Sequence, residues 1–130
     1  MKAVMLAALI CVASWGASLF ELGKEAYVNG NYEEALEYFA KAIKEKPKSA
    51  EIYYERGCLL SDLGEYEAAI KDFTKAIELK PDYGFAYNNR AISYGTSGDI
   101  EKAEKDARKA CELKVCVAYQ FMRENGFIED

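Results

Sequence analysis

The sequence contains no histidine and only two prolines among its 130 residues. Without histidine the commonest general base is missing, and Ser–His and Cys–His nucleophiles are excluded. No glycine-rich phosphate loop occurs, and the cysteines supply no second pair that would complete a zinc site. We therefore expect no catalytic residues, no metal site, no cofactor and no small-molecule substrate.

An excess of basic charge is also missing. Lys and Arg number 17 against 22 Asp and Glu, so the net charge is -5. Because nucleic-acid binding needs a concentrated Lys/Arg surface, and because Lys and Glu are interleaved here, nucleic acid is not expected as a partner. An apolar content of 51% with 30% charged residues is typical of a folded chain, and the length has room for one domain.

The chain repeats itself with a period of 34 residues. Gly23, Gly57 and Ala91 align at this period, and three further sets of small residues align with them. A fixed period of about 20 to 50 residues indicates stacked supersecondary units rather than one irregular globule. The further sets are Gly30, Gly64 and Gly98, then Ala35, Ala69 and Ala103, then Ala42, Ala76 and Ala110.

Each unit predicts two helices that are separated by a glycine. In the middle unit, apolar residues recur at helical spacing over residues 50–64 and again over residues 65–81. Gly64 lies between the two helices, where a left-handed backbone is easiest for glycine, and Pro81 ends the second helix. Two helices approach closely only where one presents a small residue, so Gly57 is expected to face Ala69 across the hairpin.

This pattern resembles the tetratricopeptide repeat over about residues 16–114. The resemblance rests on the 34-residue period, the opening of a large residue followed by Leu or Arg before Gly, and the Ala-x-x-x-Phe stretches of residues 35–39 and 69–73. Pro47 and Pro81 close the first two units. The third unit departs from the pattern, with Ala91 for Gly, Ile100 for an aromatic residue and Ala107 for a large one.

The resemblance implies an all-α fold: a right-handed superhelical stack of three helix–turn–helix units followed by a capping helix. The units cover about residues 16–49, 50–83 and 84–115, and residues 116–130 form the capping helix and tail. Within that last segment the helix is expected over residues 116–125. Phe127 and Ile128 are expected to fold back onto it.

Two cysteines lie at the junction with the capping segment. Cys111 ends the last repeat and Cys116 begins the capping segment, and a turn between them would bring their sulfurs together. In an oxidising compartment a disulfide is one outcome, holding the capping segment in place. A redox-active pair and a metal-binding pair are the alternatives.

Residues 1–18 differ from the rest of the chain. Lys2 is followed by an unbroken apolar run over residues 3–13 and then by small residues up to Ser18. This order predicts a cleaved secretory signal peptide, and so a periplasmic or secreted protein. An uncleaved membrane anchor that retains residues 3–20 is one alternative, and a lipoprotein signal at Cys11 is another.

In the repeat family, the first helix of each unit lines a concave groove that binds peptides or helices of partner proteins. The resemblance implies the same groove here, with an aromatic, amide and mildly acidic lining that suits a protein or peptide ligand. The residues expected to bind the partner are Lys24, Tyr27, Glu51, Tyr54, Glu55, Asp62, Phe85, Asn88 and Asn89, and the groove positions beside them are Phe20, Val28, Cys58, Ile92 and Thr96.

Chaperone-binding members of that family hold a peptide's terminal carboxylate with Lys, Asn and Arg residues. The corresponding positions here carry one basic residue, Lys24, where Asn is expected, so a carboxylate clamp is not expected. The other corresponding positions are Phe20, Glu55, Phe85 and Asn89.

Two arginines have a structural interpretation. Arg56 and Arg90 replace the Leu that commonly precedes the repeat glycine, and Asp72 and Asp106 come 16 residues after them. The spacing predicts the ion pairs Arg56–Asp72 and Arg90–Asp106 across the hairpins.

Together these features predict a non-enzymatic interaction scaffold or adaptor that binds a partner segment in its groove. A membrane-tethered assembly factor built on the same scaffold and a thiol-based redox protein are the alternative functions.

Overall fold

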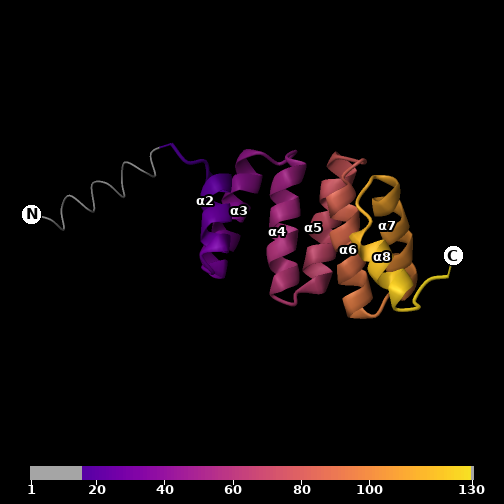
Figure 1. Cartoon of the computed structure of the whole chain (residues 1–130). Helices are drawn as coiled ribbons and strands as arrows, with labels where there is room; N and C mark the ends of the chain where they lie inside the picture. The colour runs from indigo at the N-terminus through magenta and orange to yellow at the C-terminus, as the bar shows by residue number, and fades with distance from the viewer. Residues whose placement is uncertain (1–15, 130) are drawn as a thin grey trace, which may run out of the picture. The chain divides into compact units, whose positions relative to one another are not determined.

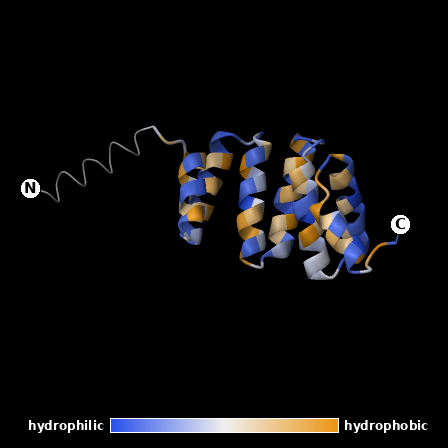
Figure 2. Ribbon diagram, viewed as in Figure 1, coloured by the Kyte–Doolittle hydropathy of each residue, from blue (hydrophilic) through white to orange (hydrophobic). Residues whose placement is uncertain are grey.

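Most of the regular structure consists of helices of 10 to 14 residues. Short turns that contain glycine or proline separate them. The computed structural model describes residues 16–129, and the signal-peptide, anchor and lipoprotein predictions lie outside these residues. The described residues form seven helices, α2 to α8 (Figure 1), and each carries both hydrophobic and hydrophilic residues (Figure 2). No described helix is both long and apolar enough to cross a bilayer. The described helices divide between two compact units, α2 and α3 in the first and α4 to α8 in the second.

The first unit is one helical hairpin. Helix α2 spans Leu19–Val28 and α3 spans Tyr32–Glu45. The Ser18 side chain caps α2 by accepting a hydrogen bond from the Glu21 N–H at 3.2 Å. Between the helices Gly30 has a φ of 80°, in the left-handed region that favours glycine.

The second unit contains the remaining five helices. They are α4 (Ala50–Asp62), α5 (Tyr66–Leu79), α6 (Gly84–Ser97), α7 (Ile100–Glu112) and α8 (Val117–Glu124). Each of these helices packs against the next one in the chain, and α6 also contacts α4 and α8. Gly64 and Gly98 have φ values of 78° and 97° in the turns, as the repeat pattern predicts. The predicted all-α architecture of helical hairpins with a C-terminal helix is therefore confirmed.

In each of the first two hairpins, a glycine of the first helix packs against a phenylalanine ring of the second. A Cβ atom on Gly23 would lie 2.7 Å from the ring of Phe39, and one on Gly57 would lie 2.7 Å from the ring of Phe73. Both rings are fully buried. The atoms nearest to a Cβ at Gly57 thus belong to Phe73, one helical turn beyond Ala69 on α5, so the glycine makes room for an aromatic ring.

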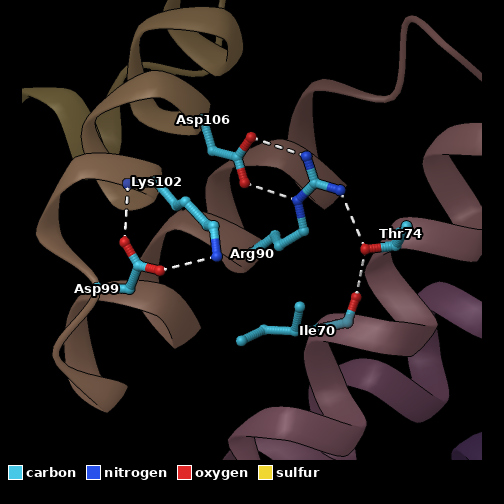
Figure 3. Close-up of polar contacts among 6 residues, drawn as sticks. All are labelled: Ile70, Thr74, Arg90, Asp99, Lys102 and Asp106. Atoms are coloured by element: carbon cyan, nitrogen blue, oxygen red, sulfur yellow. Dashed lines mark hydrogen bonds and ion pairs between the residues drawn. The ribbon is translucent and has the colours of Figure 1, made fainter.

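Both predicted ion pairs are present, and each has two-point geometry. Arg56 donates to the two carboxylate oxygens of Asp72 at 2.7 and 2.8 Å, and Arg90 donates to those of Asp106 at 2.6 and 2.8 Å. Arg90 also donates to the Thr74 hydroxyl at 3.0 Å (Figure 3). It therefore links α5, α6 and α7. Burial lowers the pKa of Arg90, but the hydrogen bonds and charge of Asp106 outweigh burial and raise it above its ordinary value.

Helix α8 covers the end of the third hairpin. Ala118 and Met122 of α8, together with Ile128 beyond it, are buried in one cluster with alanines of α6 and α7. Ile128 thus folds back as expected, whereas Phe127 remains half exposed. A disulfide joins Cys111 to Cys116 at the start of α8.

Candidate functional site

Helices α4 and α6 are the first helices of their hairpins and contact one another. The Asn89 amide on α6 donates to the Tyr54 hydroxyl at 3.2 Å and to the Cys58 sulfur at 3.3 Å, both on α4. The Tyr54 ring lies 6.0 Å from the ring of Phe73 and 5.0 Å from that of Tyr83. We call the surface formed by these two helices the α4–α6 face. Its residues are Glu51, Tyr54, Glu55, Cys58, Asp62, Phe85, Asn89 and Ile92.

The phenols at the α4–α6 face stay neutral at physiological pH. Burial, followed by the carboxylates of Glu51 and Glu55, raises the pKa of Tyr83 to about 12. Burial is also the main reason why the pKa of Tyr54 lies above its ordinary value. A neutral phenol both donates and accepts a hydrogen bond, so these side chains suit contacts with a peptide backbone.

Cys58 is a free thiol between Tyr54 and Asn89. Burial raises the pKa of the Cys58 thiol to about 11, although hydrogen bonds with those two residues act in the opposite direction. Because the thiolate is the reactive form, this thiol is a poor nucleophile at neutral pH.

We expect N-ethylmaleimide to modify Cys58 in the native protein at pH 8 about 100-fold more slowly than in the unfolded chain. The raised pKa leaves little thiolate at pH 8, and the rate should climb as the pH rises toward 11. Peptide mass mapping of Cys58, with and without urea, measures the two rates. Equal rates in both states would contradict the protection.

A recess of about 150 Å³ opens between α4 and α6. Its lining combines the Asp62 carboxylate with the Asn89 amide and the Ile92 side chain. Beside it, the hydroxyls of Ser61 and Ser93 are hydrogen-bonded at 3.3 Å and join the two helices. The recess therefore presents one acidic group and one amide beside an apolar edge.

The other predicted partner-binding residues have different surroundings. Glu51 and Phe85 are exposed on α4 and α6, and Phe85 retains 59% of its accessible surface. Lys24 and Tyr27 lie on α2 in the first unit. Lys24 pairs with Glu21 at 3.0 Å and lies over the Phe20 ring, and the Tyr27 ring packs edge-on against Tyr32.

Asn88 does not belong to the α4–α6 face. It is only 5% exposed, and its side-chain oxygen accepts a hydrogen bond from the Ala118 N–H at 2.9 Å. The first N–H groups of a helix have no partner within that helix, so Asn88 caps α8 from a neighbouring helix. The prediction that Asn88 contacts a ligand is thus corrected, because its amide is used in packing.

Two features of this region have no counterpart in the sequence-based prediction. The Tyr83 ring, from the loop before α6, packs at a tilt of 31° against the Tyr54 ring and lies outside the first-helix positions considered for the groove. A larger cavity of about 440 Å³ lies between α6, α7 and α8. Ala91, which aligns with Gly23 and Gly57, is part of its lining. Among residues 16–129, no three His, Cys, Asp or Glu side chains are placed to hold a metal ion.

Two family models described as Tetratricopeptide repeat match the sequence, over residues 20–84 and 73–105. The first of them covers half of the 130 residues. A comparison with curated proteins finds no match.

Several solved structures are similar to this chain. The first TPR of Spaghetti (RPAP3), bound to the HSP90 peptide SRMEEVD, superimposes with a TM-score of 0.77 at 25% identity, covering 82% of this chain and 86% of that one. The Arabidopsis OM64 TPR domain gives the same TM-score and identity, covering 82% and 93%. MamA has a TM-score of 0.72 at 27% identity, covering 74% of this chain and 56% of its own.

Proposed function

Since the chain belongs to the tetratricopeptide repeat family, we propose that it is a non-enzymatic scaffold that binds a partner's peptide segment on the α4–α6 face. Similar domains in the solved structures hold a peptide, which supports an interaction role. The observation that carries the proposal is the make-up of the face, which combines an exposed Phe85 and a neutral Tyr54 with an open recess that the Asn89 side chain lines.

The bound segment differs in charge from the peptide that Spaghetti binds. SRMEEVD contains three acidic residues and ends in a carboxylate. The α4–α6 face carries Glu51, Glu55 and Asp62, and the two arginines of α4 and α6 are already engaged by Asp72 and Asp106. Like charges brought together at an interface oppose binding. An acidic peptide of this kind is therefore not the proposed ligand.

We place the scaffold outside the cytoplasm, as a further part of the proposal. The composition of residues 1–18 supports a signal peptide, and the Cys111–Cys116 disulfide is typical of an oxidising compartment. N-terminal sequencing of the natural protein tests this. A chain that begins after Gly16 or Ser18 supports cleavage, and one that still begins at Met1 supports the membrane-tethered alternative.

The binding proposal is tested by capture of partners with the full chain and with the variants Tyr54→Ala and Asn89→Ala. Lys75→Ala, an exposed position on α5, is the matched control. Both face variants should lose the partner that the wild type and the control retain, while circular dichroism shows unchanged helix content. Retention of every partner by both face variants contradicts the proposal. The peptide SRMEEVD should bind none of the four proteins.

A further inference from the structure

The third hairpin lacks the aromatic ring that fills the other two. Phe39 and Phe73 align with Ala107 at the 34-residue period, and the glycines that they contact align with Ala91. A glycine–phenylalanine pair is thus replaced by two alanines. Because two methyl groups occupy much less volume than a phenyl ring, this exchange leaves space inside the third unit.

Side chains of α8 and of the segment after it pack against these alanines. Met122 and Ile128 join Ala91 and Ala107 in a buried cluster. Beside the cluster remains the cavity of about 440 Å³, whose lining includes Ile92, Gly95, Ile100 and Phe121. We call this cavity the α8 pocket. Its volume lies in the range of about 300 to 1,000 Å³ that is typical of ligand sites.

The rim of the α8 pocket is exposed and apolar. Ile92 retains 45% of its accessible surface, Phe121 60% and Phe127 50%. Soluble proteins rarely leave large apolar side chains gathered around an open cavity unless something binds there. A cavity of this size with exposed apolar side chains around its opening indicates a binding site for a bulky apolar group.

The α8 pocket and the recess of the α4–α6 face meet at one shared residue. Ile92 lines both the α8 pocket and the recess that contains Asp62. A chain that places an apolar side chain in the pocket can therefore place a neighbouring side chain in the recess. A carboxylate can accept about four hydrogen bonds, so Asp62 is able to take up a cationic group in addition to its existing contacts.

We propose that the α8 pocket anchors a large apolar side chain of the partner segment, and that an adjacent Lys or Arg of the same segment pairs with Asp62. This rests on the proposed function and specifies its ligand: a segment in which an aromatic or large aliphatic residue is flanked by a basic one. The negative charge of Asp62 in the neighbouring recess favours this occupant over an uncharged acyl chain. A second copy of the chain is an outcome that the test distinguishes.

The probe is a fluorescent nine-residue peptide with a central Phe followed by Lys in a Gly/Ser background. Two matched peptides replace the Phe with Gly or the Lys with Glu. Anisotropy titrations of the full chain should show the first peptide binding at least about tenfold more tightly than either of the others. Its affinity should fall as salt is added, because Asp62 is exposed and salt screens charges at the surface.

Gly95→Leu fills the α8 pocket without disturbing the helix. A Cβ atom at Gly95 meets only the Ala103 methyl at 3.7 Å, and leucine favours helix more than glycine does. This variant should weaken binding of the Phe–Lys peptide at least about tenfold. Lys105→Leu, which adds the same side chain to an exposed position on α7, is the control and should bind like the wild type.

The outcomes separate the two proposals. Weaker binding in Gly95→Leu but not in Lys105→Leu supports the anchor. Unchanged binding in Gly95→Leu overturns it, and if Tyr54→Ala still loses partners the proposed function survives. Equal binding of all three peptides overturns the stated chemistry. Analytical ultracentrifugation tests whether a second copy of the chain occupies the pocket. If the wild type is a dimer, Gly95→Leu is a monomer and the Phe–Lys peptide does not bind, the peptide anchor is overturned in favour of a second copy.

Discussion

Replacing Asp106 with alanine is expected to lower the free energy of unfolding by about 3–5 kcal/mol, because it leaves Arg90 buried without its anion. Asp106 is only 4% exposed and accepts two short hydrogen bonds from Arg90. Arg90 would keep only its bond to Thr74, and α6 and α7 would lose their main polar link. Urea denaturation followed by circular dichroism measures the change.

Two further variants serve as comparisons for Asp106→Ala. Glu104→Ala removes an exposed partner of Arg108 and should cost less than about 1 kcal/mol. Asp72→Ala should be intermediate, because the Arg56 side chain is 27% exposed against 16% for Arg90 and is therefore better able to regain water. If Asp106→Ala is as stable as Glu104→Ala, the buried ion pair contributes no more to the free energy of unfolding than the exposed one does.

Phe73→Ala should also destabilise the protein by about 3–5 kcal/mol, because a fully buried ring leaves a cavity. Gly57→Ala alone should cost about 0–2 kcal/mol, since its methyl group would overlap that ring while alanine improves helix propensity. In the double variant the new methyl enters the space that the ring has left. The pair should therefore cost at least about 1 kcal/mol less than the sum of the single changes.

The natural third unit already contains this alanine pair, at Ala91 and Ala107. Ala91→Gly is the reciprocal control, because position 107 holds no phenylalanine; it should lose helix propensity and one buried methyl group, about 1–2 kcal/mol. A double-mutant cycle by urea denaturation determines the coupling. Additive effects of Gly57→Ala and Phe73→Ala on the free energy of unfolding would contradict the close contact between this glycine and the phenyl ring.

Much of the hairpin architecture is predictable because it depends on short-range features that recur. The glycines at positions 30, 64 and 98 adopt the left-handed turns that the repeat pattern predicts, because other residues resist positive φ. The Arg56–Asp72 and Arg90–Asp106 pairs are predictable as well. A constant spacing of 16 residues brings each pair together across a hairpin of constant length.

The candidate site is predictable in outline but not residue by residue. Asn88 and Asn89 are neighbours with the same chemistry, and the repeat pattern predicts a ligand contact for both. Successive side chains on a helix point about 100° apart, so one amide reaches α4 while the other caps α8. Which of them faces outward depends on where α8 packs, and the repeat pattern does not extend to that helix.

Periodicity and residue type thus suffice for the helix pairs, their turns and their internal ion pairs, because each arises within one hairpin and is repeated. Contacts between side chains of different helices need the packed structure. The phenyl ring of Phe73 supplies the atoms nearest to Gly57, and the α8 pocket is lined jointly by residues of α6, α7 and α8, among them Ala91, Ile100 and Met122. Such volumes depend on how the helices approach one another, which no spacing along the chain encodes directly.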